Sequence, residues 1–108
     1  MNDIYVGSGN LDGKGVYANR RFSKGEVVVK YNLKLLSQEE YKALPRSEEM
    51  FTHGHRGQIY LYSEPERYVN HSDHPNTNPD LRQHADVAIK NIEKDEMIAT
   101  DATMDDVV

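Results

Sequence analysis

Short apolar runs separated by turn signals limit most strongly how this chain of 108 residues can fold. The runs at residues 4–6, 16–18 and 27–29 favour extended backbone, and the three consecutive valines of the last give the clearest strand signal. Clusters of Gly, Ser, Asn and Asp lie between them, and the Asp12-Gly13 pair is typical of a tight turn. Because helical periodicity is nearly absent, the sequence predicts a mostly β domain of several short sheets.

One short helix is predicted in the middle of the chain. Ser37 followed three residues later by Glu40 is the signature of a capping box, and Pro45 ends a helix over 38–44. Residues 45–57 are polar and irregular, which predicts a mobile loop or a single helical turn.

The second half of the chain alternates between strand and loop signals. Strands are predicted over residues 58–62, 86–90 and 97–100, whereas residues 64–80 are dense in Pro, Asn, Asp and His and predict an ordered loop. Residues 22–26 and 92–96 resemble each other, and we interpret both as tight turns at strand entries whose likeness is accidental.

Length and composition exclude several classes of protein. The chain has room for one domain, residues 1–108, and it contains no cysteine, so disulfides, cysteine nucleophiles and thiolate zinc clusters are excluded. No apolar run is long enough to span a membrane, and the first residues lack the order of a signal peptide. We therefore expect an intracellular location, cytoplasmic or nuclear depending on the host.

The net charge of −5 bears on the choice of partner. A nucleic-acid-binding protein usually presents a basic face, so direct nucleic-acid binding is not expected. An acidic domain is better matched to a basic partner, such as a lysine-rich peptide.

Residues 67–76 form the most informative stretch, Arg-Tyr-Val-Asn-His-Ser-Asp-His-Pro-Asn. Asn70, His71 and Ser72 place several side-chain donors and acceptors in a segment too irregular to satisfy its own backbone. Such a segment either fixes a loop or holds a polar ligand. Taken alone, the fixed loop is the simpler interpretation, because Asn and Ser in loops usually bond to their neighbours.

The order of motifs along the chain resembles the SET-domain family of protein-lysine methyltransferases. The motifs are Gly-Lys-Gly-Val-Tyr-Ala at 13–18, Lys-Gly-Glu at 24–26, Arg-Tyr-Val-Asn-His-Ser at 67–72 and Pro75-Asn76. The resemblance covers about residues 9–101. It implies a β-clip fold of several short sheets with a pseudoknot-like crossing, in which the end of the chain passes under a loop near residues 70–76. A buried crossing of this kind needs side chains to satisfy its backbone groups.

The resemblance also implies a cofactor, S-adenosylmethionine, and the residues that bind it. Gly13, Lys14 and Gly15 match the backbone that lies against the methionine portion of the cofactor, where glycine permits a close approach. Asn70 and His71 match residues that contact its amino-acid end and its adenine. The implied reaction transfers the cofactor's methyl group to the side chain of a lysine in a protein or peptide.

Methyl transfer to lysine requires a neutral amine, although free lysine has a pKa of about 10.4. A narrow aromatic channel favours the neutral form by desolvation, and Tyr62 and Tyr60 are the candidate catalytic residues. Tyr62 lies eight residues before Asn70, where the family often carries a channel tyrosine. Tyr60 shares its face in a strand. The alternative for Tyr62 is a half-buried strand tyrosine without a catalytic role.

The end of the chain departs from the family pattern. The family's closing strand ends in Asp-Tyr, whereas here Asp101 is followed by Ala102. The alternative function is therefore a catalytically weak or silent SET-like module that binds cofactor or peptide. The chain also lacks the cysteines of a post-domain zinc module, so one wall of the lysine channel must come from elsewhere, and homodimerisation is one way to supply it.

The histidines raise a third hypothesis, a small metal-binding domain. His53 and His55 would share one face of a strand, but they lie in a stretch without a clear strand signal, and His71 is explained by the family motif. No metal site is therefore predicted.

Overall fold

The computed structural model describes residues 3–55, 57–80 and 82–101, and in these segments it is rich in short strands. The strands are β1 (Ile4–Leu11), β2 (Lys14–Ala18), β3 (Val27–Lys30), β4 (Leu33–Leu36), β5 (Thr52–His55), β6 (Gln58–Tyr62), β7 (Asn70–His71), β8 (Thr77–Asp80), β9 (Ala85–Ala88) and β10 (Met97–Thr100). The helical elements are α1 (Gln38–Ala43), α2 (Arg46–Glu49) and the 3₁₀ turn η1 (Glu66–Tyr68). The predicted mostly β fold is confirmed.

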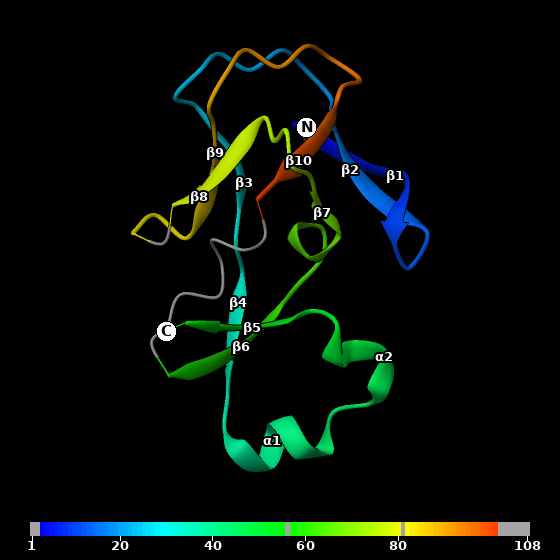
Figure 1. The fold of residues 1–108 in the computed structure, drawn as a ribbon, viewed down its shortest axis with the longest axis vertical. Helices are drawn as coiled ribbons and strands as arrows, with labels where there is room; N and C mark the ends of the chain where they lie inside the picture. The colour runs from blue at the N-terminus through cyan, green and yellow to red at the C-terminus, as the bar shows by residue number, and fades with distance from the viewer. Residues whose placement is uncertain (1–2, 56, 81, 102–108) are drawn as a thin grey trace.

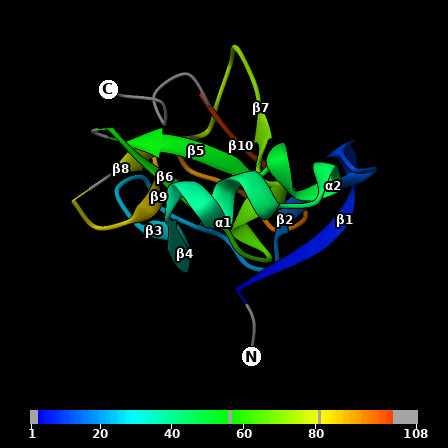
Figure 2. The ribbon, with the colours of Figure 1, turned by 90° about the horizontal axis from the view of Figure 1, so that it is seen from below.

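The strands form two sheets (Figure 1). The larger sheet has the order β1-β2-β10-β8-β9-β3, with β7 pairing to β10, and the smaller has the order β4-β6-β5. Figure 1 places the larger sheet in the upper half and the smaller sheet with α1 and α2 in the lower half. The view from below in Figure 2 shows both helices in front of the sheets. Strands β3 and β4 follow each other along the chain and so connect the two halves.

The core lies within the larger sheet and under the turns at its top. Phe22, Ile92, Ile98 and Val16 are completely buried, and Val29 nearly so. Burying side chains of this size stabilises a fold by about 1.5–3 kcal/mol each. The segments that carry these core residues therefore contribute strongly to the stability of the fold.

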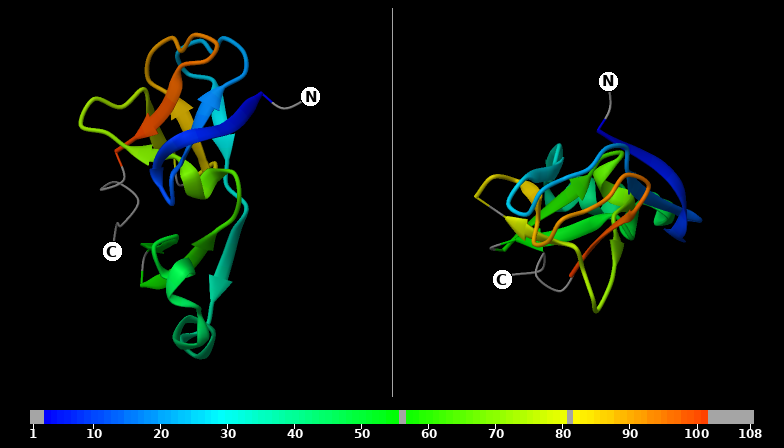
Figure 3. Two further views of the ribbon diagram at one scale, coloured as in Figure 1. Left: turned by 90° about the vertical axis from the view of Figure 1, so that its right-hand side faces the viewer. Right: turned by 90° about the horizontal axis from the view of Figure 1, so that it is seen from above.

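Phe22 and Ile92 join two turns that are built alike. Each residue donates its backbone N–H to the other's carbonyl oxygen, at 2.8 and 2.9 Å. Gly25 donates to Ala88 O, and its counterpart Asp95 donates to Ala18 O, so the bonds of one turn repeat those of the other. The two loops lie side by side at the top of Figure 3, left, in blue and orange. Both are turns at strand entries, as predicted, but their likeness is structural rather than accidental.

Strand β10 occupies the centre of the fold. It pairs antiparallel with β2 and parallel with β7 and β8, so the last described strand lies between the first hairpin and the 70–77 segment. Asn76 holds it in place, because its side chain accepts from Ala99 N at 2.9 Å and donates to Met97 O at 2.8 Å. Thr77 Oγ1 also donates to Ala99 O. The expectation that side chains satisfy the backbone at this crossing is confirmed.

Several boundaries differ from the sequence-based prediction. Strand β1 continues through Gly7 to Leu11, because Ser8 pairs with Lys14 and backbone pairing does not need apolar side chains. The segment predicted as a mobile loop or a single helical turn contains such a turn, α2, and also the strand β5, which was not predicted. His53 and Gly54 lie in β5, paired with Tyr60 and Ile59, because β6 offers them an edge that the local sequence does not reveal.

Helix α1 begins as predicted. Glu40 N–H donates to Ser37 Oγ at 3.1 Å, and Ser37 N–H donates to Glu40 Oε1 at 3.0 Å, which completes the capping box. Within the described segments, no helix has the length and apolar character needed to cross a membrane.

Candidate functional site

Asn70 ties together the segments that the sequence identifies as cofactor-binding. Its side-chain amide donates to Lys14 O at 3.0 Å and to Tyr68 O at 2.8 Å, and its Oδ1 accepts from Asn10 N at 2.8 Å. The residue is 3% exposed. The Asn70 side chain therefore fixes the loop, which is one of the two interpretations of the 67–76 segment. It also sets the position of the Lys14 backbone, on which the other interpretation, a ligand site, depends.

The glycines beside Lys14 serve different purposes. Gly13 has a φ of 75°, which the tight turn requires and which other residues rarely adopt. A Cβ on Gly15 would lie 3.1 Å from both Met97 Cε and Ser8 O, and 3.3 Å from Asn70 Nδ2. A Cβ on Gly9 would lie 2.3 Å from Lys14 O, a requirement that the sequence analysis missed. Gly9 and Gly15 thus allow the first hairpin to pack closely on itself and against Asn70.

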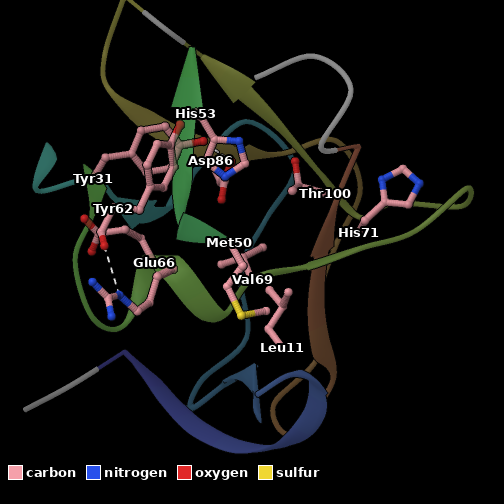
Figure 4. A pocket seen from close by; sticks show the side chains of 11 residues that line it. Leu11, Tyr31, Met50, His53, Tyr62, Glu66, Val69, His71, Asp86 and Thr100 are labelled. Atoms are coloured by element: carbon pink, nitrogen blue, oxygen red, sulfur yellow. Dashed lines mark hydrogen bonds between the residues drawn. The ribbon is translucent and has the colours of Figure 1, made fainter. Parts of the chain in front are cut away.

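A cavity of about 90 Å³ lies between this region and the smaller sheet (Figure 4). It has room for a few water molecules or the end of a side chain, but not for a nucleoside. The lining residues come from both halves of the fold: Leu11, Tyr31, Met50, His53, Tyr62, Glu66, Arg67, Val69, His71, Asp86 and Thr100.

The structure separates the two candidate tyrosines. Tyr62 is buried and lines the cavity, with its ring centroid 5.2 Å from that of Tyr31 and 4.5 Å from that of His53. Tyr60 does not line it, and its hydroxyl donates to Gln58 Oε1 at 2.9 Å. Tyr62 therefore remains the better-placed candidate for a channel residue.

His71 lies at the opposite side of the cavity from Tyr62 (Figure 4). Its Nε2 is 3.3 Å from Asp73 Oδ1, and its Nδ1 is 3.8 Å from Asp101 Oδ1. The side chain is 43% exposed, so it remains accessible to a ligand at the surface. The structure thus places one predicted cofactor residue and one predicted catalytic residue on the walls of the same cavity.

A buried carboxyl group stands at the aromatic side of the cavity. Asp86 is 2% exposed, and the Tyr31 hydroxyl donates a hydrogen bond to its Oδ1. Burial raises the pKa of Asp86 from 3.8 to about 7, the bond from Tyr31 opposes this, and the charge of Glu66 adds to it. Burial also raises the pKa of Glu66, whose carboxylate accepts from Asn32 N. The cavity therefore contains a carboxyl group that titrates near neutral pH.

Thr100 contributes an unusual polar atom to the same cavity. Its Oγ1 is buried and, within the described segments, has no hydrogen-bond partner. Buried hydroxyls are nearly always bonded, because an unmet bond costs free energy. Its position next to Asp101 at the end of β10 makes it a group available for a ligand.

The family model described as "SET domain" matches residues 13–101. The chain belongs to the SET-domain family. A comparison with curated proteins gives no match.

Solved structures share the fold of this SET domain. A candidate histone methyltransferase of Plasmodium falciparum matches with a TM-score of 0.73 and 24% identity, covering 94% of this chain and 93% of that one. A humanized mutant of the Chaetomium thermophilum Polycomb Repressive Complex 2, bound to an inhibitor, matches with a TM-score of 0.71 and 22% identity over 94% of this chain. That match covers 15% of the other chain.

A further structure, ctPRC2 in an autoinhibited conformation, is bound to S-adenosylmethionine. It matches the SET domain with a TM-score of 0.72 and 19% identity, covering 97% of this chain and 16% of that one. At these identities the likeness concerns the fold.

The metal hypothesis finds no geometry to support it. In the segments that the structure describes, no three His, Asp or Glu residues are arranged to hold an ion. The His53 ring instead lies against the Tyr62 ring at an interplanar angle of 57°, and His71 faces Asp73 and Asp101. Ala102, the departure from the SET pattern, lies outside the described residues.

Sequence reasoning missed the acidic and hydroxyl groups of the SET-domain cavity. Asp86 is the first residue of the strand predicted over 86–90, where an aspartate is usually solvent-facing, and its partner Tyr31 is far away in the sequence. Thr100 was assigned only as a strand residue. The one local signal was a charged residue between Ala85 and Val87 in an otherwise apolar run.

Proposed function

We propose that this SET domain transfers a methyl group from S-adenosylmethionine to the side chain of a lysine in a protein or peptide. One observation carries the proposal. The segment in which Asn70 bonds to the Lys14 backbone continues directly into His71, which lines the same cavity as Tyr62. Membership of the SET-domain family supports the reaction class. The neighbour that binds S-adenosylmethionine supports the cofactor.

The residues present fit the cofactor. Gly13 and His71 are exposed and accessible to a ligand, and Gly15 lets the backbone pack closely against Asn70, where a Cβ would lie 3.3 Å from Nδ2. Gly13, Lys14, Gly15, Asn70 and His71 would hold the cofactor, which supplies an activated methyl group on a sulfonium.

The cavity supplies the conditions that a lysine amine needs. Apolar side chains of Leu11, Met50 and Val69 line one wall (Figure 4) and suit the methylene stem of a lysine. Tyr62 lies beyond them and walls the far end with its ring. A cavity of this small size would strip most water from the amine, which disfavours the charged ammonium, and would restrict its direction of approach.

The substrate is proposed to be a basic protein or peptide. The net charge of −5 favours encounter with lysine-rich segments over nucleic acid or an anionic membrane surface. Homodimerisation remains a proposal for completing the lysine channel, and the location in the cell is proposed to be intracellular.

The test is methyl transfer from isotopically labelled S-adenosylmethionine to core histones and to a lysine-rich peptide pool, with methyllysine detected after hydrolysis. Wild type is expected to label lysine, and Tyr62→Ala to lose at least tenfold in rate. His74→Ala is the control, because His74 is an exposed residue between β7 and β8 that does not line the cavity. Cofactor binding without any lysine labelling would favour the silent-module alternative raised by Ala102.

A further inference from the structure

The cavity lining contains a carboxyl group that the proposed methyl transfer does not yet use. Asp86 is 2% exposed, and its Oδ1 accepts a hydrogen bond from the Tyr31 hydroxyl. It lines the cavity together with Tyr62. Figure 4 shows Asp86 beside His53 and Tyr31, with Thr100 on the side nearer His71. Burying a carboxyl group costs free energy, and buried carboxyl groups in cavities often have a function.

A second, independent feature points to a polar ligand in the same space. Thr100 Oγ1 lines the cavity, is buried and has no partner within the described segments. The apolar side chains of Leu11, Met50 and Val69 line the same cavity. One ligand with an aliphatic stem and a cationic tip satisfies both features.

We propose that Asp86 is the proton acceptor for the substrate lysine and that Thr100 orients the amine. This rests on the proposed function. The ammonium gives one proton to the Asp86 carboxylate, which leaves a neutral amine and a protonated aspartic acid. The amine's lone pair then forms the N–C bond to the methyl group, the C–S bond breaks, and its electron pair stays on sulfur as a thioether.

The surroundings of Asp86 suit proton transfer near neutral pH. Its register neighbours on the flanking strands, Val29 on β3 and Pro79 on β8, carry no charge. The titratable and charged groups that face it across the cavity are Tyr31, His53, Tyr62, Glu66, Arg67 and His71. Burial holds the pKa of Asp86 at about 7, close to the operating range of an effective general base.

Two variants separate this role from a structural one. Asp86→Asn keeps the volume and removes the titration, and Tyr31→Phe keeps the ring and removes the hydrogen bond. With core histones as probe, the wild-type transfer rate is expected to rise with pH up to about 7 and then level off. Asp86→Asn is expected to lose at least tenfold at pH 7.5 and to keep gaining rate up to pH 9, where more of the free amine is neutral. Calorimetric affinity for S-adenosylmethionine should stay within twofold.

A binding measurement tests the inference without turnover. The side-chain carboxyl of Asp86 is followed by carbon-13 NMR during a pH titration, with n-butylammonium as the lysine mimic and n-butanol as the uncharged control. We expect n-butylammonium to lower the pKa of Asp86 by about one unit, equivalent to about tenfold tighter binding to the ionised form. Thr100→Val should reduce that shift.

The outcomes distinguish this inference from the proposed function. An Asp86 titration that n-butylammonium leaves unchanged overturns the inference, as does a folded Asp86→Asn variant with the wild-type rate and pH profile. Wild type that fails to bind S-adenosylmethionine overturns the proposed function instead, and the NMR titration still reports on Asp86.

Discussion

The side-chain amide of Asn70 donates to the backbone oxygen of Lys14, so a residue of the central loop fixes the backbone of the first hairpin. The same side chain accepts from Asn10 N and donates to Tyr68 O, which uses its donors and its acceptor within the fold. A cofactor site built on this backbone depends on Asn70 for its shape. The fold and the proposed cofactor site therefore depend on the same buried amide.

Asn70→Ala is expected to destabilise the fold by about 2–4 kcal/mol, because it leaves the Asn10 N–H and the Lys14 carbonyl without this partner. Urea unfolding followed by circular dichroism measures the change. Asn70→Asp should be no milder, since it keeps the acceptor for Asn10 but places a carboxylate against two carbonyl oxygens. A loss below about 0.5 kcal/mol in Asn70→Ala would show that these hydrogen bonds contribute little.

Ile92→Val is expected to cost about 0.5–1.5 kcal/mol, because Ile92 is fully buried where the two equivalent turns meet. Ile89→Val is the matched control, since Ile89 is 36% exposed and its truncation should cost less than about 0.5 kcal/mol. Thermal unfolding of both variants gives the comparison. Equal losses would argue against the turn pair as a core element.

The stability of the fold is expected to depend on pH through Asp86. Its folded pKa of about 7 lies above the ordinary value of 3.8, so the unfolded chain loses this proton first as the pH rises. Asp86 therefore lowers the free energy of unfolding progressively between about pH 4 and pH 7, on the order of 4 kcal/mol in total, and not further above pH 7.

Asp86→Asn should remove this part of the pH dependence and be more stable than wild type at pH 8. Denaturant unfolding between pH 4 and pH 8 compares the two proteins, and Asp12→Asn, which changes an exposed aspartate, serves as the control. Parallel curves for wild type and Asp86→Asn would refute the assignment of a raised pKa.

Gly15→Ala is expected to weaken S-adenosylmethionine binding at least tenfold, because the new methyl group would lie 3.1 Å from Met97 Cε and Ser8 O and 3.3 Å from Asn70 Nδ2. Gly57→Asn is the control, since Gly57 has a φ of 78° with nothing within 4 Å of the added Cβ, and Asn tolerates this conformation. Unchanged affinity in Gly15→Ala would show that the cofactor does not bind against this backbone.

The sequence predicted those features whose signals are local. The capping box of Ser37 and Glu40, the strand over 58–62 and the strand over 97–100 follow from residue types within a few positions, and the structure confirms them. The Asn-His-Ser string marked the segment that contacts both the first hairpin and β10, because few other functions require that order of polar residues.

The features that escaped prediction depend on contacts between distant segments. Strand β5 exists because β6 pairs with it, and the burial of Asp86 depends on Tyr31 from another part of the chain. The unbonded Thr100 hydroxyl cannot be recognised from its neighbours in sequence, since threonine is ordinary in strands. The pairing of Phe22 with Ile92 likewise could not be predicted, because the sequence does not show that the two similar turns face each other.

The most direct test of the proposed function is calorimetric titration of S-adenosylmethionine into the wild-type protein, His71→Ala and His74→Ala. The proposal predicts saturable one-to-one binding by wild type and by His74→Ala, and at least tenfold weaker binding by a folded His71→Ala. A folded wild-type protein that binds no S-adenosylmethionine would contradict it.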